Sequence, residues 1–348
     1  VHGGGFYHPV KFAVRPPELP GHLHWFYWES YSTWLTGFAL FSVSYLWNAE
    51  SYLVDKSRMD WSPGAAVAAA LGFLVVFWLA YDAICRVWGQ RPGGDRIVGA
   101  LVALLVALAA WLACHWFAGR AAFLLMGAML ATSMSANVFF WIIPGQRTVV
   151  QSIRDDQPVD PIHGQRGKQR SVHNTYFTLP VLFAMLSNHY SFTYSHPQNW
   201  LILILMMLAG ALIRQFFVMR HGYKLGRNAS PLRYALAGVL IILALLVWLR
   251  PEPVPAPSTV AAPPSVGATV GFKTVQAVLE QRCTLCHGAL VQMKNVRLDS
   301  AERIHQHAQA LYQQAVVSKI MPMNNATGIT EAERALIGQW FLAGAKTE

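Results

Sequence analysis

Long runs of apolar residues alternate with short polar stretches over the first 250 residues of this 348-residue chain. Runs of about 20 residues with few charges have the length of a helix that crosses a lipid bilayer. The pattern predicts about seven such helices, over residues 25–47, 65–85, 97–117, 122–143, 173–190, 200–219 and 232–249. The fifth run is short, polar at both ends and contains Pro180. We therefore expect an all-α, polytopic transmembrane helix bundle over residues 1–250, embedded in a lipid bilayer.

The pattern changes after residue 250. Six prolines lie between Pro251 and Pro264, which is typical of an extended, semi-rigid linker, and we assign the linker to residues 251–270. Residues 271–348 show helical periodicity over 272–281 and 300–317, and again from the cap-like pair Thr330 and Glu333 through Phe341. The sequence therefore predicts a small, helical C-terminal domain.

The most specific motif is the string CTLCH over residues 283–287. In a C-x-x-C-H string the two thiols form thioethers with a haem, and the adjacent histidine ligates its iron. A zinc site would need a second pair of ligands nearby, and a thioredoxin-like redox pair would need a βαβ context. The surrounding sequence offers neither, so we predict one covalently bound haem c.

The order of helix, C-x-x-C-H, helix, methionine loop and final helix resembles class I cytochrome c. The resemblance implies that the second axial ligand of the iron comes from the loop Met321-Pro322-Met323. Met321 is followed directly by proline and matches the family pattern better than Met323. A methionine ligand raises the haem potential, which suits an electron acceptor. The expected haem-binding residues are Cys283, Cys286, His287 and Met321, with the last two on the iron.

The composition fits a membrane protein, with 54% hydrophobic and 13% charged residues. A formal net charge of +10 would favour nucleic acid only if the charge were clustered. Residues 270–348 hold eight Lys/Arg against six Asp/Glu, so the excess belongs to the first 250 residues. We therefore predict no nucleic-acid partner.

The positive charges also indicate an orientation. The cytochrome c resemblance implies haem attachment outside the cytoplasm. Seven spans then place residues 1–24, 86–96, 144–171 and 220–233 in the cytoplasm, and these segments carry 14 Lys/Arg. The opposite side carries Lys56, Arg58, Arg120 and, at the last exit, Arg250. This asymmetry follows the positive-inside rule, so we expect a multi-pass protein of the bacterial inner membrane with its C-terminal domain in the periplasm.

Several strings are too polar and aromatic for ordinary membrane spans. They cover residues 2–8 (HGGGFYH), 22–29 (HLHWFYWE), 135–146 (SANVFFWIIPGQ), 170–183 (RSVHNTYFTLPVLF) and 186–190 (LSNHY). Together with the C-terminal C-x-x-C-H domain, they resemble the bacterial membrane-bound urate hydroxylase (urate oxidase) family over nearly the whole chain. Members of that family carry an earlier hydrophobic helix, so we expect a further segment before Val1.

The resemblance implies oxidation of urate to 5-hydroxyisourate in purine breakdown. Electrons would pass to haem c and on to an acceptor of the respiratory chain, such as a cytochrome oxidase or a soluble cytochrome. A histidine is suited to act as the base, because its pKa lies near working pH. Our catalytic candidates are His22, His24 and His173, which lie on the predicted cytoplasmic side. They adjoin a basic loop predicted over residues 144–171, whose arginines suit a planar anion, although topology alone also predicts a basic loop there.

This arrangement raises a difficulty, because electrons from a cytoplasmic urate site would have to cross the membrane to a periplasmic haem. One hypothesis is a second redox centre among the spans, such as haem b held by two histidines. The other is an active site that opens to the periplasm. The histidines considered for haem b are His24, His115, His173 and His189, and no spacing selects two of them. Asp82 and Arg86 have helical i,i+4 spacing, and we interpret them as an ion pair at the membrane interface.

Two other functions account for parts of the sequence. A membrane-anchored cytochrome c, acting as an electron carrier or as an oxidase accessory subunit, would need far fewer than seven spans. A transporter or receptor with a redox-sensing tail would show Gly/Pro-broken helices in two matching halves, and the sequence has no such symmetry. We take urate oxidation as the main hypothesis and the anchored electron carrier as the alternative.

Overall fold

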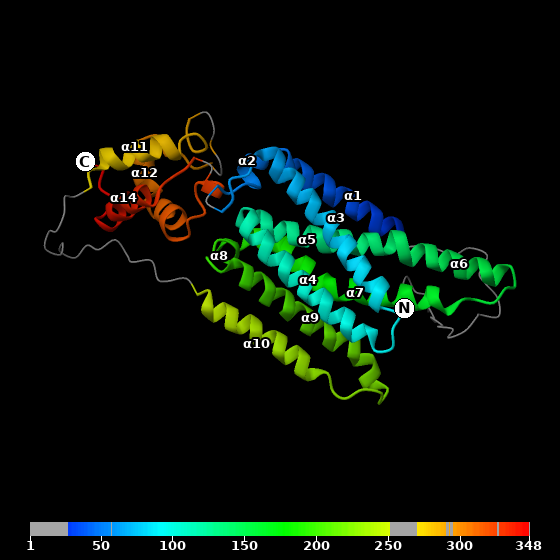
Figure 1. Ribbon diagram of the computed structural model, residues 1–348. Helices are drawn as coiled ribbons and strands as arrows, with labels where there is room; N and C mark the ends of the chain where they lie inside the picture. The colour runs from blue at the N-terminus through cyan, green and yellow to red at the C-terminus, as the bar shows by residue number, and fades with distance from the viewer. Residues whose placement is uncertain are drawn as a thin grey trace, which may run out of the picture.

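The computed structural model describes residues 27–56, 58–250, 270–289, 292, 295–325 and 327–347. All regular secondary structure within these ranges is helical (Figure 1). The predicted linker lies outside the described residues except for Val270. The candidates His22 and His24 also lie outside them, so their roles stay predictions.

The long helices of the first 250 residues run side by side as a bundle (Figure 1). A long first helix (α1, Tyr27–Phe41, with η1, Ser42–Leu46) is followed by the short α2 (Ala49–Tyr52). The remaining elements are α3 (Pro63–Trp88), α4 (Gly94–Trp116), α5 (Gly119–Asn137), η2 (Val138–Ile142), α6 (Ile143–Arg154), α7 (Pro161–Leu186), η3 (Ser187–His189), α8 (Ser191–Tyr194), α9 (Asn199–Lys224) and α10 (Leu232–Trp248).

Four helical segments of the described chain are long and apolar enough to cross a membrane: Pro63–Trp88, Gly94–Trp116, Gly119–Arg154 and Asn199–Lys224. They match the second, third, fourth and sixth predicted spans. Large apolar side chains such as Leu104, Leu240 and Val247 point outward, as expected for helices in lipid. The first predicted span starts outside the described residues. The fifth lies partly in α7, a helix whose first half is polar. The seventh corresponds to α10, which is only 17 residues long. These three spans stay predictions.

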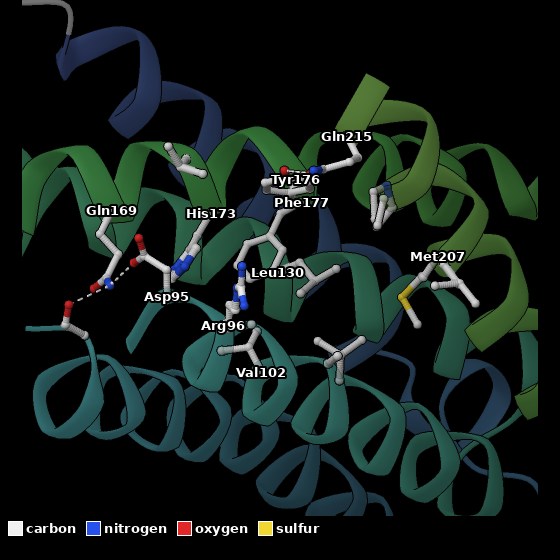
Figure 2. Close-up of a pocket in the computed structure, with 18 of the residues that line it drawn as sticks. Asp95, Arg96, Val102, Leu130, Gln169, His173, Tyr176, Phe177, Met207 and Gln215 are labelled. Carbon is white, nitrogen blue, oxygen red and sulfur yellow. Dashed lines mark hydrogen bonds between the residues drawn. The ribbon is translucent and has the colours of Figure 1, made fainter. Parts of the chain in front are cut away.

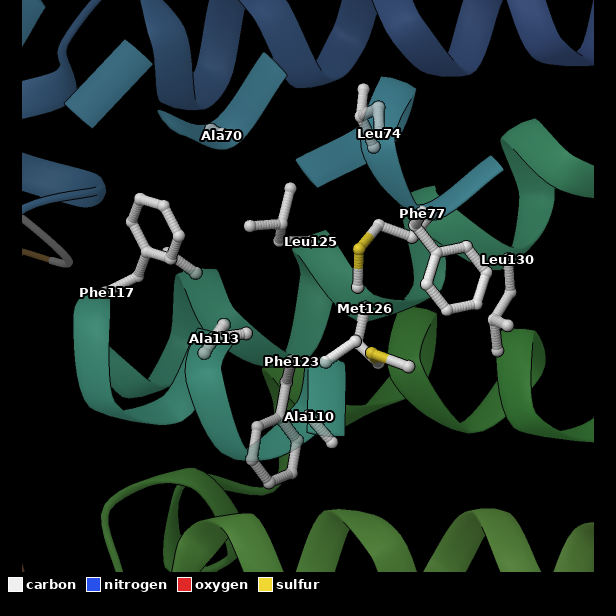
Figure 3. Close-up of a cluster of buried hydrophobic side chains, with 14 of the residues drawn as sticks. Ala70, Leu74, Phe77, Ala110, Ala113, Phe117, Phe123, Leu125, Met126 and Leu130 are labelled. Carbon is white, nitrogen blue, oxygen red and sulfur yellow. The ribbon is translucent and has the colours of Figure 1, made fainter. Parts of the chain in front are cut away.

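The core of the bundle lies where α3, α4 and α5 meet (Figure 3). Leu74 and Phe77 of α3 pack with Ala110 of α4 and with Phe123 and Met126 of α5. Small residues let the next helix approach closely, as is common between membrane helices. A Cβ atom added to Gly127 of α5 would lie 2.7 Å from the Cβ of Ala184 of α7. This close packing fixes α7 against α5.

The structure corrects the loop that the sequence predicted over residues 144–171. Helices α6 and α7 cover nearly all of this range, and only residues 155–160 connect them. The Asp160 side chain accepts a hydrogen bond from the backbone N–H of Ile162, and Pro161 occupies the first helical turn, so α7 has a strong N-terminal signal. The apolar run that predicted a span from residue 173 begins 12 residues after the helix itself. Arg170 is therefore a helix residue, not a loop residue.

The C-terminal residues form a separate helical unit with its own core, made of residues such as Phe272, Leu279, Ile337 and Phe341. Its elements are α11 (Phe272–Arg282), α12 (Ala301–Gln306), α13 (Ala308–Leu311), η5 (Tyr312–Val317), η6 (Met323–Asn325) and α14 (Glu331–Leu342). They confirm the helices predicted over 272–281 and 300–317 and the capping box at Thr330 and Glu333. The unit lies beside the end of the bundle that carries α2, and η6 packs against α2 (Figure 1).

Candidate functional site

A cavity of about 880 Å³ lies between α4, α7 and α9 (Figure 2). Cavities that hold small molecules in proteins typically measure about 300–1,000 Å³. The lining extends along the helices, from Asp95 near the start of α4 to Ala107, which is roughly 18 Å further at 1.5 Å per residue. The cavity therefore has the size of a ligand site and reaches from one end of the bundle toward its middle.

One end of this cavity is polar and the other is apolar. His173 and Asp95 lie at the polar end and Met207 lies at the other (Figure 2). The side-chain N–H of Gln169 donates to Asp95 Oδ1 at 3.0 Å and to the Gly89 carbonyl at 3.2 Å. Three cationic residues of the lining gather near this end, namely Arg91, Arg96 and Lys168. Because they outnumber Asp95, the polar end attracts an anion.

Behind His173, the bundle buries an ion pair. Arg170 is only 2% exposed and Asp82 only 4% exposed, and Arg170 Nη2 lies 2.6 Å from Asp82 Oδ1. The indole N–H of Trp141 donates to the same oxygen at 2.7 Å. Arg86 Nε lies 2.6 Å from Asp82 Oδ2, which confirms the predicted Asp82–Arg86 pair. Charges inside a membrane domain are costly unless they are paired, and here both carboxylate oxygens have partners.

A chain of hydrogen bonds connects this ion pair to the cavity. Arg170 Nη1 donates to Asn137 Oδ1 at 3.3 Å. The Asn137 amide N–H donates to Asn174 Oδ1 and to the Tyr81 hydroxyl, each at 2.9 Å. Tyr81 Oη lies 2.9 Å from His173 Nδ1. His173 thus belongs both to the buried network and to the cavity lining.

Helical spacing explains why these side chains meet. Arg170, His173, Asn174 and Phe177 have i, i+3, i+4 and i+7 spacing and share one face of α7. Tyr81, Asp82 and Cys85 share a face of α3 in the same way. Asp82 and His173 were recognised from the sequence, and Asn137 and Asn174 lie in the polar strings 135–146 and 170–183. Tyr81 and the partner role of Arg170 were not recognised. The Asp160-Pro161 helix start would have placed Arg170 on this face.

In the C-terminal unit, the C-x-x-C-H string forms a tight turn after α11. The His287 N–H donates to the Cys283 carbonyl at 2.9 Å. His287 Nδ1 lies 3.2 Å from the Val296 carbonyl, which fixes the proton on Nδ1 and leaves Nε2 with a free lone pair. This is the state that a histidine needs to ligate haem iron.

The two cysteines also fit a covalent haem. Burial raises the pKa of the Cys283 thiol to about 11, so the free Cys283 side chain is a neutral thiol at neutral pH. The described residues hold no cluster of three or more His, Cys, Asp or Glu that would bind a metal ion. Cys286 is exposed, as is Leu285 beside it. The donor set therefore matches the chemistry of haem c.

Arg334 holds the backbone of Met321 in place. Its guanidinium donates to the Met321 carbonyl at 2.8 Å and lies close enough to Cys283 to influence that thiol electrostatically. One buried arginine thus contacts the Met321 loop and acts electrostatically on the Cys283 thiol. Met323, the alternative ligand, lies two residues further on, at the start of η6.

Of the histidines considered for haem b, His24 lies outside the described residues, and the other three do not all lie at one end of the bundle. His173 lies at the polar end of the cavity, whereas His189 lies in η3, beyond the opposite end of α7. Sixteen residues separate them, which is roughly 24 Å along a helix. His115 lies near the last residue of α4, with Nδ1 2.7 Å from the Trp111 carbonyl. A haem b stays a prediction.

A smaller cavity of about 310 Å³ lies between the bundle and the C-terminal unit. From the bundle it is lined by residues that include Arg58, Arg120 and Tyr194, and from the C-terminal unit by residues that include Lys319, Met321 and Glu331. The methionine loop therefore faces the bundle.

A protein-family model described as "Urate oxidase N-terminal" matches residues 1–250 of the chain. This range covers the whole bundle, including the cavity and the network behind His173. No curated protein and no solved structure matches the chain.

Proposed function

Because this chain belongs to the urate oxidase N-terminal family over residues 1–250, we propose that it oxidises urate to 5-hydroxyisourate within the membrane and delivers the electrons to haem c. In this reaction the urate monoanion and water give 5-hydroxyisourate, two electrons and one proton. The observation that carries the proposal is the cavity that ends at His173. It combines a cationic polar end with a half-buried histidine, inside the part of the chain that matches the family.

The polar end of the cavity suits the urate ring. Urate is a planar anion whose carbonyl oxygens accept hydrogen bonds, and Arg91, Arg96 and Lys168 supply a positive potential there. His173 is the residue of this end that the buried network holds in place, so it is the residue that we expect to contact the substrate. A fixed orientation of a contacting group is what lets it act on the reacting ring without reorganisation.

Cys283, Cys286, His287 and Met321 would hold haem c, which would supply the electron acceptor. The residues around it have their own tasks. The Val296 carbonyl holds the His287 ring at 3.2 Å, and Arg334 holds the Met321 carbonyl at 2.8 Å. The placement of Met321 against the bundle supports electron transfer from the membrane domain to this unit. We expect the bundle in the bacterial inner membrane, the C-terminal unit in the periplasm, and a respiratory-chain acceptor such as a cytochrome oxidase or a soluble cytochrome.

Filling the cavity tests the proposal. Gly99 lines the cavity from α4 one turn after Asp95, and a Cβ atom added there meets no atom within 4 Å. Gly99→Trp would therefore place an indole at the polar end, in the space proposed for the substrate. We expect membranes that contain this full-length variant to lose most of the urate consumption seen with the wild type.

The matched control is Leu104→Trp, because Leu104 lies on the same helix, is 66% exposed and faces away from the cavity. It should keep near wild-type urate consumption. Haem content, measured after dithionite reduction, should be equal in all three proteins. Equal urate consumption by the two tryptophan variants would place the substrate outside this cavity.

A further inference from the structure

The side chains behind His173 determine which of its ring nitrogens carries the proton. A chain of hydrogen bonds has a defined direction wherever one end is only a donor and the other end is only an acceptor. The network in the bundle has both kinds of end. Arg170 is the donor-only end, because a guanidinium has no acceptor, and the Met134 carbonyl is the acceptor-only end.

These two ends determine how the side-chain amides of Asn137 and Asn174 are oriented. Arg170 Nη1 faces Asn137 Oδ1 at 3.3 Å, so the Asn137 oxygen must point toward the guanidinium. The Asn174 amide N–H donates to the Met134 carbonyl at 3.0 Å, so Asn174 Oδ1 is left to accept. Asn137 Nδ2 lies 2.9 Å from Asn174 Oδ1 and 2.9 Å from Tyr81 Oη. It therefore donates one proton to each of them.

The same donor-to-acceptor direction continues from Asn137 through the Tyr81 hydroxyl to His173. Its hydroxyl oxygen already accepts from Asn137, and His173 Nδ1 lies 2.9 Å from the same oxygen. The Cys85 thiol also contacts the Tyr81 hydroxyl and could take its proton, but a thiol sulfur is a much weaker acceptor than an imidazole nitrogen. The hydroxyl proton of Tyr81 therefore goes to Nδ1. A neutral imidazole whose Nδ1 accepts carries its own proton on Nε2.

We propose that His173 is a specificity-determining hydrogen-bond donor, whose Nε2–H is fixed by Tyr81, Asn137 and Asn174 and is presented to the cavity. The ligand atom opposite it must then be an acceptor, which means a carbonyl oxygen or a deprotonated ring nitrogen. This inference rests on the proposed function only for the identity of the ligand, urate. It gives His173 the role of a donor instead of a base, and it removes His173 from the histidines considered for haem b, because a protonated Nε2 does not ligate iron.

The tautomer is measurable in the resting full-length protein without urate. In protein labelled with ¹⁵N-histidine, solid-state NMR distinguishes protonated from bare ring nitrogens. The difference between the wild type and His173→Gln isolates the His173 signals. We expect Nε2 to be protonated and Nδ1 to be bare. A proton on Nδ1 would overturn the proposal.

Kinetics test the role of the donor. We expect His173→Phe to raise KM for urate by about tenfold to a hundredfold, since it removes a hydrogen bond to a charged ligand. His173→Gln keeps an amide N–H and should recover much of this loss. Tyr81→Phe removes the hydroxyl that fixes the tautomer and should raise KM by about twofold to tenfold, with a smaller change in kcat.

Two control variants change the same residue types elsewhere. His221→Gln alters an exposed histidine in the last turn of α9, and Tyr234→Phe removes a hydroxyl on α10 that accepts from Arg233 at 3.2 Å. Both should keep the wild-type KM. If the wild type oxidises urate and His173→Phe has the wild-type KM, the proposed role of His173 is wrong, whereas the proposed function is unaffected. If the wild type does not oxidise urate, the proposed function falls, and the NMR result still decides whether His173 presents a donor.

Discussion

Arg170 carries a positive charge inside the bundle, where water does not solvate it. Its side chain pairs with Asp82 at 2.6 Å, and its guanidinium lies over the rings of Tyr81 and Trp141, 5.0 and 5.1 Å from their centroids. The same carboxylate is shared with Arg86 at 2.6 Å, but the Arg86 side chain is 60% exposed. Asp82 therefore has one buried and one exposed partner, and the two contribute unequally to stability.

We predict that Arg170→Met destabilises the protein strongly, by about 3–5 kcal/mol, because it leaves the Asp82 carboxylate buried without its main partner. Arg86→Met removes a solvent-screened partner of the same carboxylate and should cost about 1 kcal/mol or less. The measurement is the thermal unfolding of each full-length variant in the same detergent. Equal losses of stability in the two variants would show that the buried Arg170–Asp82 pair contributes no more than the exposed Arg86–Asp82 pair.

At the scale of single helices, α14 depends on its first turn. The Thr330 hydroxyl accepts from the Glu333 N–H at 3.2 Å, and Glu333 Oε2 accepts from the Thr330 N–H at 2.7 Å. The hydrogen bond from the Thr330 backbone is the main cause that lowers the pKa of Glu333 below its ordinary value of 4.5, and Arg282 lowers it further. The capping box therefore links the start of α14 to α11.

Loss of the cap should loosen α14 in a pH-dependent way. Thr330→Ala should cost about 1 kcal/mol at neutral pH. Because the folded-state pKa of Glu333 is lowered, the ionised carboxylate stabilises the fold above pH 4.5, and this contribution is lost as the pH falls through the lower folded-state value. Glu333→Gln should therefore speed hydrogen exchange in α14 relative to the wild type at pH 7, with little difference below the folded-state pKa. A difference that persists there would contradict the ionic contribution.

The same capping signals show how far sequence predicts the elements. Thr330 with Glu333 marked the start of α14 correctly, because a capping box is local and needs no tertiary partner. Asp160 and Pro161 mark the start of α7 equally well, but the basic residues after them resemble a membrane-flanking loop. The apolar run therefore predicted a helix start that lies too late in the sequence. Without those 12 residues of helix, the face that brings Arg170 to Asp82 and His173 to Tyr81 could not be recognised.

At the scale of the whole molecule, the sequence predicted the bundle and the C-terminal unit better than the tertiary contacts within and between them. The apolar runs and the C-x-x-C-H string each follow from local pattern. The cavity depends on three helices, α4, α7 and α9, which are distant in sequence, and the placement of Met321 beside Arg120 and Tyr194 depends on tertiary packing. Such contacts leave no periodic signal, so no pattern of residues predicted them.

In the proposed function, urate oxidised in the bundle delivers its electrons to a haem held by the C-terminal unit. The most direct test mixes the purified full-length protein with urate in the absence of oxygen and follows the haem c absorbance. We predict rapid reduction of the haem by urate, with loss of this reduction in His287→Ala. A haem that dithionite reduces but urate does not would contradict the claim and would leave a membrane-anchored electron carrier as the better account.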